Sequence, residues 1–149
     1  MQIERMPVEV IRPLRHRVLR PGLPAESAKF DGDDDPETIH LAVLVDREVV
    51  GCVTLLPNPL DGRPAWQLRG MAVDEACRNR GIGSAVLEAV NSALPFEHTL
   101  WCNARVPVSA FYIRHSWVTV SKPFDIPTVG PHVRMCRNAT APEQPARSG

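Results

Sequence analysis

Two arginines and two glycines lead directly into an apolar helical pattern in the stretch RNRGIGSAVL, residues 78–87. The first turn of a helix has unpaired N–H groups and the positive end of the helix dipole, so it attracts anions. Gly81 and Gly83 remove side chains that would hold an anion away from these amides, and Arg78 and Arg80 add positive charge. This spacing predicts a phosphate-binding turn, while glycines that serve only a tight turn are the alternative.

Two common nucleotide-binding motifs do not fit this stretch. A P-loop places Lys and then Ser or Thr after its second glycine, whereas Ser84 and Ala85 follow Gly83. A dinucleotide fingerprint has a third glycine where this chain has Val86, and no βαβ pattern precedes the stretch. The predicted phosphate therefore belongs to a different class of ligand.

A strand and a helix flank the predicted turn. Residues 66–73 have the composition of a strand, and Gly70 within them indicates a bulge or a close backbone approach. Apolar residues then recur at helical spacing, so a helix is expected over about residues 83–94, where Pro95 ends it. The turn thus connects the end of a strand to the start of a helix.

The first third of the chain predicts a helix, a loop and a hairpin. Apolar residues at spacings of three and four indicate an amphipathic helix over residues 7–19, with three arginines, Arg15 among them, on the other face. Residues 21–38 have no period, contain three prolines and carry an acidic cluster. They predict a surface loop that is either simply solvated or attractive to a cationic amine. Two strand-like runs within residues 40–56, separated by a short polar stretch, predict an antiparallel hairpin.

Length and charge limit the classes of function. The 149 residues suit one domain, and Lys+Arg and Asp+Glu are both 17, so there is no basic field for nucleic acid or an anionic membrane. The N-terminus has no signal-peptide pattern and no apolar run approaches a membrane span, so we expect a cytoplasmic protein. Cys52, Cys77, Cys102 and Cys136 are widely spaced, which indicates reduced thiols and no metal site.

Two separate blocks of the sequence resemble motifs of the GNAT superfamily of N-acetyltransferases. The R-x-x-G-x-G pattern of Arg78, Gly81 and Gly83 follows a strand ending LRGMAVD and is similar to the acyl-coenzyme A motif of that family. The segment LWCNARVPVSAFYIRHSW resembles the next block, a strand carrying an Asn and then a helix with a Phe-Tyr pair. The segments VLRPG, QLRGMAV and PHVRM resemble a bacterial branch whose substrates are mostly undefined.

The resemblance implies a mixed α/β fold with a central, mainly antiparallel sheet of six or seven strands and helices on both faces. Composition alone indicates only a mixture of helices and strands. We expect one GNAT-like domain over residues 1–137. The polar, proline-containing residues 138–149 are expected to form a disordered tail.

The function implied by the resemblance is transfer of an acetyl group from acetyl-CoA to a primary amine of a small molecule or protein. The sequence does not define the amine, and a homodimer stays open. Two other classes of function also stay open. One is a non-catalytic acyl-CoA sensor, which would keep RNRGIG, and the other is a phosphate-binding interaction domain unrelated to coenzyme A.

The resemblance also implies where the coenzyme lies. In GNAT proteins the strand before the motif is splayed from its neighbour, and its free backbone groups, here those of Met71, Ala72 and Val73, pair with the pantetheine arm. The diphosphate lies on the amides of residues 78–84. Asn103 matches a residue that often contacts the arm, although a buried Asn that satisfies a strand end is the alternative. The implied coenzyme-binding residues are Met71, Ala72, Val73, Arg78, Asn79, Arg80, Gly81, Ile82, Gly83, Ser84 and Asn103.

Tyr112 is the predicted catalytic acid. Acetyl transfer requires attack on the thioester carbonyl, stabilisation of the oxyanion and protonation of the departing thiolate, and a tyrosine can supply that proton. A tyrosine pKa of about 10 lies above the thiol value of about 8.5, so the transfer needs help from the site. The alternative is a tyrosine that packs beside Phe111. His132 is the predicted general base because imidazole titrates near neutrality, with His40 and Asp125 as rivals.

Two further expectations concern the backbone near these residues. A bulge at Gly70 would leave strand amides unpaired, so an N–H near Met71 is the expected oxyanion donor. Ser116 and Trp117 stand where many GNAT proteins have Gly-Phe. The turn after the Tyr112 helix must therefore form without the freedom of glycine at positive φ.

Overall fold

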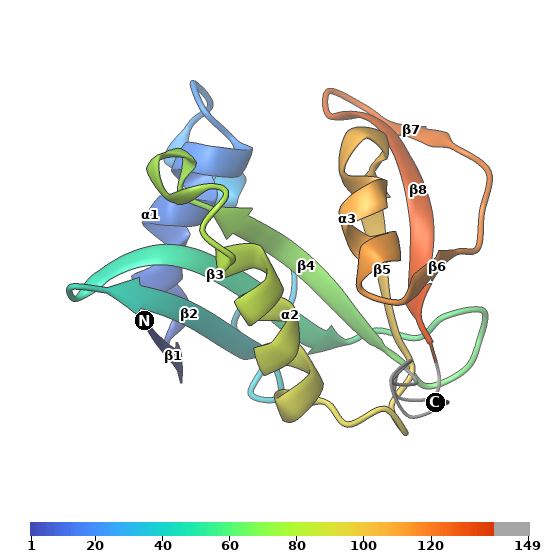
Figure 1. Ribbon diagram of the computed structural model, residues 1–149. Helices are drawn as coiled ribbons and strands as arrows, with labels where there is room; N and C mark the ends of the chain where they lie inside the picture. Colours follow the sequence, from blue (N-terminus) through green and yellow to red (C-terminus); the bar gives the residue numbers. More distant parts are fainter. Residues whose placement is uncertain (139–149) are drawn as a thin grey trace.

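The computed structural model describes residues 1–138, which form one mixed sheet with helices on both faces (Figure 1). The strands are β1 (Gln2–Arg5), β2 (Ile39–Val45), β3 (Glu48–Pro57), β4 (Trp66–Val73), β5 (Leu100–Arg105), β6 (Trp117–Thr119), β7 (Phe124–Ile126) and β8 (Gly130–Arg137). The helices are α1 (Val8–Leu19), α2 (Ile82–Ala93) and α3 (Ser109–Arg114), with short 3-10 turns η1 (Ala25–Ala28), η2 (Glu75–Cys77) and η3 (Val106–Val108).

The strands of the sheet are ordered β1-β2-β3-β4-β5-β8-β6, and β7 pairs with β8. The pairing of β4 with β5 is parallel, whereas the other described pairings are antiparallel. The predicted mixed, mainly antiparallel sheet is therefore confirmed. The expected six or seven strands were too few, because three of the eight strands are only three or four residues long and carry almost no periodicity.

The single domain predicted over residues 1–137 stays a prediction. The tail predicted over residues 138–149 lies, apart from its first residue, outside the described residues. Within residues 1–138, no helix has the length and apolar character that crossing a bilayer requires.

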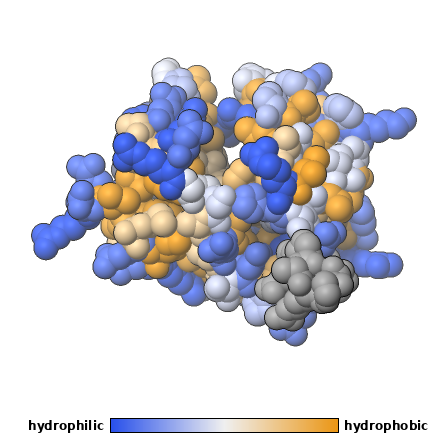
Figure 2. All heavy atoms as spheres, viewed as in Figure 1, coloured by the Kyte–Doolittle hydropathy of each residue, from blue (hydrophilic) through white to orange (hydrophobic). Residues whose placement is uncertain are grey.

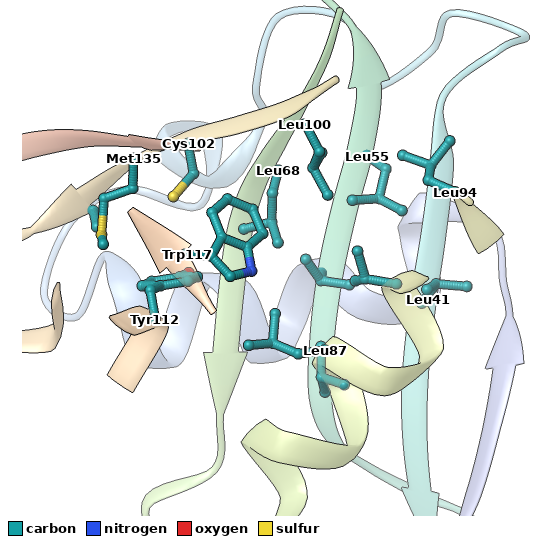
Figure 3. Close-up of a cluster of buried hydrophobic side chains, with 14 of the residues drawn as sticks. Leu41, Leu55, Leu68, Leu87, Leu94, Leu100, Cys102, Tyr112, Trp117 and Met135 are labelled. Carbon is teal, nitrogen blue, oxygen red and sulfur yellow. The ribbon is translucent and has the colours of Figure 1, made fainter. Parts of the chain in front are cut away.

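Helices α1 and α2 cover opposite faces of the sheet. Val86 of α2 belongs to the same core cluster as Val43 of β2, whereas Ile11 of α1 packs in a second cluster with Ala42. Because neighbouring residues of a strand point to opposite faces, these contacts place the two helices on opposite sides. Figure 1 shows α2 and α3 in front of the sheet and α1 behind it, and Figure 3 shows the larger cluster, to which α2 contributes Leu87.

The hairpin between β2 and β3 confirms the prediction from residues 40–56. Its two connecting residues, Asp46 and Arg47, have φ values of 50° and 68°. Positive φ at both positions is typical of the type I′ turn, whose twist matches that of the flanking strands. Glu48, expected in the connection, is instead the first residue of β3.

The predicted polar face of α1 is wrong at Arg15, which is fully buried. Its Nη1 donates to the Asp33 carboxylate at 2.7 Å and to the carbonyl of Ala28 at 2.9 Å, and its Nη2 donates to Thr54 Oγ1 at 2.6 Å. Asp33 itself is only 7% exposed. Residues 21–38 are mostly loop, as predicted, but they fold back on α1 and bury one member of the acidic cluster.

The predicted bulge in β4 is confirmed. Cys52 of β3 pairs with Ala72, but Thr54 pairs with Arg69, so β4 has one extra residue in this interval. Gly70 lies in it with φ +64°, a value that glycine adopts without strain. The bulge interrupts the β3–β4 ladder beside the point where β4 leaves its other neighbour.

Candidate active site

A cleft opens where β4 and β5 separate. The two strands share only the pairs Trp66–Leu100 and Gln67–Trp101. Beyond Gln67, no strand within residues 1–138 pairs with β4 on its β5 side. The resulting cleft has a volume of about 1090 Å³. Figure 2 shows a hollow at the top of the molecule between the side that carries α1 and the side that carries α3.

The turn before α2 forms one wall of this cleft. Gly81 caps α2 in a left-handed conformation with φ +76°, and the first helical hydrogen bond runs from the Ala85 amide to the Gly81 carbonyl at 3.0 Å. The amides of residues 79–84 have no hydrogen-bond acceptor in the part of the chain that the structure describes. The helix begins one residue earlier than predicted, at Ile82, and these free donors lie at its positive end.

Gly83 has a packing role besides leaving the amides accessible. A Cβ atom built at Gly83 would lie 3.2 Å from the Phe111 ring and 3.7 Å from Met71 Cε, so α3 packs closely on the first turn of α2. The next residue, Ser84, is hydrogen-bonded through Oγ to His115 Nε2 at 3.1 Å. These contacts join α2 to α3 beside the cleft.

Tyr112 belongs to the larger hydrophobic core cluster and places its phenol at the cleft. The residue is 6% exposed, and its hydroxyl donates to Met71 Sδ at 3.7 Å. Burial, with a smaller contribution from Cys102, raises the pKa of Tyr112 well above its ordinary value. Figure 3 shows the Tyr112 side chain beside Trp117, and the two ring centroids are 5.2 Å apart.

The turn after α3 forms without glycine at the expense of local strain. Ser116 has φ +70°, the left-handed region that non-glycine residues adopt only at some cost. The turn brings Trp117 back beneath Tyr112, where its side chain is buried. With Ser116 and Trp117 in place of the usual Gly-Phe pair, Tyr112 still lines the cleft.

His132 and His40, two of the three proposed bases, differ in whether a ring nitrogen is free to accept a proton. His132 is buried in β8 and lines the cleft, and its Nδ1 lies 2.8 Å from the Gly130 carbonyl. A carbonyl accepts, so Nδ1 carries the hydrogen and Nε2 is the nitrogen that can accept a proton. His40 has both ring nitrogens engaged, with Thr54 Oγ1 at 2.8 Å and with the Asp33 carbonyl at 3.0 Å.

The third base candidate and the predicted coenzyme-contacting asparagine lie on two different strands, β7 and β5, each of which pairs with β8. Asp125 is exposed on β7 and is not part of the cleft lining among the described residues. Asn103 lines the cleft from β5, and its Oδ1 accepts from Arg134 Nε at 3.4 Å. Its side chain is therefore held by the neighbouring strand β8 rather than free.

The structure brings nearly all the predicted site residues to one cleft. Arg80 is the exception, since it is exposed and lies outside the lining formed by residues 1–138. The predicted residues that line the cleft are Met71, Ala72, Val73, Arg78, Asn79, Gly81, Ile82, Gly83, Ser84, Asn103, Tyr112 and His132.

Several residues that line the cleft were not among the site residues predicted from the sequence. Arg20, Phe30, Arg69 and Arg105 also line it. Three of them occur in the segments VLRPG, QLRGMAV and CNARV, next to residues that drew attention for other reasons. The signal that could have identified the three arginines is their position in the chain. One directly follows a helix, one precedes the bulge and one ends the strand that separates from β4.

The chain belongs to the acetyltransferase (GNAT) family, whose sequence profile matches residues 9–113. It is 31% identical over 140 residues to the uncharacterized N-acetyltransferase YitI of Bacillus subtilis, an alignment that covers 91% of this chain and 94% of that protein. These matches confirm the predicted family and the predicted enzyme class, an N-acetyltransferase. Enzymes of this family use acetyl-CoA.

Solved structures with low sequence identity share the fold. Escherichia coli ElaA has a TM-score of 0.74 at 18% identity, with 93% of this chain and 100% of that chain covered. An aminoglycoside 6′-N-acetyltransferase complexed with coenzyme A has a TM-score of 0.71 at 16% identity, with 97% and 100% covered. At this level of identity the likeness shows the GNAT fold alone.

Proposed function

We propose that this GNAT acetyltransferase transfers the acetyl group of acetyl-CoA to the primary amine of a small molecule or protein. The free amides of residues 79–84 are the observation that carries the proposal, because all of these residues except Arg80 line the same cleft as the unpaired edge of β4. The amides bind the coenzyme diphosphate, and Arg78 adds a positive charge at the mouth of the cleft. Met71, Ala72 and Val73 offer their backbone groups to the pantetheine arm.

The same residues fit an anionic ligand on electrostatic grounds. Arg78 is exposed, lines the cleft and forms no ion pair within residues 1–138. A Cβ atom at Gly81 would meet no atom within 4 Å, so the space beside its α-carbon is open. An anion can therefore approach the backbone there without displacing protein atoms.

Tyr112 supplies the proton that the departing thiolate needs. Burial raises its pKa, so the phenol is protonated at neutral pH, but its proton transfer to the thiolate is then further uphill than for an ordinary tyrosine. The transfer therefore depends on the same burial raising the proton affinity of the thiolate as well. Its hydroxyl already lies beside Met71, the residue next to the bulge at Gly70. The N–H of Met71 is the proposed donor to the oxyanion, and His132 Nε2 is the proposed acceptor of the amine proton.

Two measurements on the purified protein test this proposal. At about 100 times Kd, acetyl-CoA should stabilise the fold by about 2.7 kcal/mol, which raises Tm by roughly 5 to 10 °C for a domain of this size. Release of free thiol with a panel of amines then tests turnover. A thermal shift without thiol release would favour an acyl-CoA sensor, and no shift at all would favour an interaction domain unrelated to coenzyme A.

A further inference from the structure

We propose that the acceptor amine also carries an anionic group, a carboxylate in the simplest case, and that Arg20 and Arg105 bind this group. The inference rests on the proposed function and adds a substrate class to it. It concerns the part of the cleft beside the end of α1, rather than the turn before α2.

Two guanidinium groups from distant parts of the chain converge on one carbonyl oxygen. Arg20 follows the last residue of α1 and Arg105 ends β5. Arg20 Nη1 donates to the Leu19 carbonyl at 3.0 Å, and Arg105 Nη2 donates to the same oxygen at 3.4 Å. A helix C-terminus offers only about half of a negative charge, so it cannot balance two full positive charges.

These two charges have no carboxylate partner in the described part of the chain. Its ion pairs involve Arg12, Arg15, Arg17 and Lys29, but neither Arg20 nor Arg105. Arg15, whose charge also acts on Arg20, is balanced by Asp33. The pair formed by Arg20 and Arg105 therefore keeps a positive charge that an anionic group of a ligand can bind.

The surroundings of Arg20 disfavour its charge. Burial lowers the pKa of Arg20, and the charges of Arg105 and Arg15 lower it further, so the guanidiniums repel one another. Arg20 also lies over the Phe30 ring at 5.3 Å, which holds it at the cleft rather than in solvent. A bound carboxylate would relieve the repulsion, since a guanidinium binds carboxylates through two parallel hydrogen bonds.

The pair is placed to hold an acceptor next to the thioester. Phe30 connects Arg20 to the bulge, because a Cβ atom at Gly70 would lie 3.1 Å from the Phe30 ring. On the other strand, Arg105 is the cross-strand partner of His132, the proposed base. An anion bound here leaves the amine of the same molecule between the proposed base and Met71.

Arg69 in the same cleft is a weaker candidate for this role. Its Nη1 is already bound to the Asp31 carbonyl at 2.7 Å and its Nη2 to Gln67 Oε1 at 2.8 Å. The carboxylates of Asp33 and Asp31 offset part of its charge. Arg69 therefore has less need of an external anion than the other pair.

The chemistry of the transfer is unchanged by this group. The amine nitrogen forms a bond to the acetyl carbon, the C–S bond breaks, the sulfur receives a proton from Tyr112, and the amine proton leaves to His132. Exchange with solvent then removes the proton from His132 and returns one to Tyr112, so both groups regain their starting protonation states. The carboxylate binds before and after the step without reacting. The product is an N-acetyl compound with the same anionic group, together with free coenzyme A.

A matched panel of acceptors tests the inference on the full-length protein. Each set contains an amino acid, its amide and the amine formed by its decarboxylation, and ethanolamine is compared with O-phosphoethanolamine to separate carboxylate from phosphate. We expect kcat/KM for the member of at least one set that carries the anionic group to exceed that of the members that lack it by tenfold or more. Arg20→Gln and Arg105→Gln should each raise KM for that acceptor about tenfold or more, change kcat less, and leave KM for the matching amide unaltered. Arg47→Gln, which removes the same charge from an exposed hairpin turn, is the control.

Acetyl-CoA affinity, measured by calorimetry on each variant, separates the inference from the proposed function. If the wild-type protein binds no acetyl-CoA, the proposed function fails. If it binds acetyl-CoA but acetylates amines that lack an anionic group as well as those that carry one, only the inference is overturned. Binding of acetyl-CoA without acetylation of any amine would count against the proposed function itself. It is also overturned if Arg20→Gln and Arg105→Gln weaken acetyl-CoA binding as much as they weaken acceptor use, because the pair would then bind the coenzyme.

Discussion

The Tyr112 hydroxyl and Met71 Sδ lie 3.7 Å apart, which joins α3 to the strand edge exposed by the splayed sheet. Sulfur is a weak acceptor, so the hydrogen bond to Met71 orients the phenol hydroxyl but costs little free energy to break. The hydroxyl can therefore exchange this partner for a ligand group. Its position depends on Trp117, which packs against the ring from the other side of a strained turn.

Replacing Tyr112 with Phe should lower kcat by about 100-fold or more, the range expected for loss of a general acid. Affinity for acetyl-CoA and thermal stability should change little, since the ring and its packing stay. Steady-state kinetics with calorimetric Kd values measure both effects. Phe111→Leu, which alters a neighbouring ring without removing a hydroxyl, is the control, and an unaltered kcat in Tyr112→Phe would assign the tyrosine to packing.

Gly81→Ala should weaken acetyl-CoA binding more than its effect on stability explains. A left-handed conformation costs a non-glycine residue about 1–2 kcal/mol, and Gly81 has φ +76° with no atom within 4 Å of a built Cβ. Gly62 has φ +75° and equally open surroundings in a turn outside the cleft, so Gly62→Ala carries the same strain. Equal loss of stability in both variants, with weaker acetyl-CoA binding only in Gly81→Ala, is the expected result. Equal affinities would refute the phosphate-binding role of this turn.

Gly83→Val should disturb the site through a different contact. The new side chain would collide with Phe111, since a Cβ atom alone already lies 3.2 Å from that ring. We expect weaker acetyl-CoA binding with the fold retained, and partial recovery in the double variant Gly83→Val/Phe111→Ala, where the ring is absent. Circular dichroism checks the fold and calorimetry checks binding. No recovery in the double variant would mean that crowding of the ligand itself causes the loss.

Asp33→Asn should destabilise the protein by about 3–5 kcal/mol, because it leaves the buried Arg15 charge without a partner. Asp34→Asn, at the exposed neighbouring residue, is the control and should change stability by less than about 0.5 kcal/mol. Urea unfolding at neutral pH measures both. A small effect of Asp33→Asn would show that the buried pair contributes little to stability.

The same aspartate predicts the direction of a pH effect. Burial raises the pKa of Asp33, but hydrogen bonds from Arg15, the Phe30 amide and Arg12, with the charge of Arg15, outweigh burial and lower it. A lowered folded-state pKa contributes stability above the unfolded value of about 3.9, and this contribution is lost as the pH falls from there through the folded value. The stability difference between wild type and Asp33→Asn should therefore shrink in acid. A difference that stays constant down to pH 2 would contradict this linkage.

Cys77 should react with thiol reagents before the two buried cysteines do. Burial raises the pKa of Cys52 to about 12 and also raises that of Cys102, whereas Cys77 is partly exposed and lines the cleft directly before the turn. Iodoacetamide at pH 8, followed by mass spectrometry, gives the order of modification. Saturating acetyl-CoA should slow the reaction at Cys77, with the partly exposed Cys136 as the internal control. Equal rates at Cys77 with and without acetyl-CoA would place the ligand elsewhere.

Local sequence signals predicted the parts of the fold that depend on local geometry. Gly70 predicted the bulge in β4 because few residues other than glycine adopt its backbone conformation without strain. The short polar link after β2 predicted the hairpin for a similar reason, since a two-residue turn limits the possible register. The site residues of the turn before α2 came from residue types placed at fixed spacing, and family resemblance supplied the order of the remaining elements.

Contacts between distant residues could not be predicted in this way. Arg15 looks like a polar surface residue because its partner Asp33 lies 18 positions away, in a segment without any period. Arg20 and Arg105 meet over a separation of 85 positions at the carbonyl of Leu19, and neither position looks unusual by itself. Such pairs depend on how loops return to the sheet, which residue periodicity does not encode.

The short junction of β4 with β5 has a mechanical consequence. Within residues 1–138, the two β4–β5 residue pairs are the only strand pairing that joins the half of the sheet formed by β1 to β4 to the half formed by β5 to β8. A pantetheine arm bound along β4 would form backbone hydrogen bonds with the edge of this strand that β5 leaves unpaired. The donor substrate would then take the place of a neighbouring strand in the sheet. The sheet would then be more rigid with the coenzyme bound and more flexible after its release. Amide-hydrogen exchange in β4 would be slower in the bound state, so it distinguishes the two states.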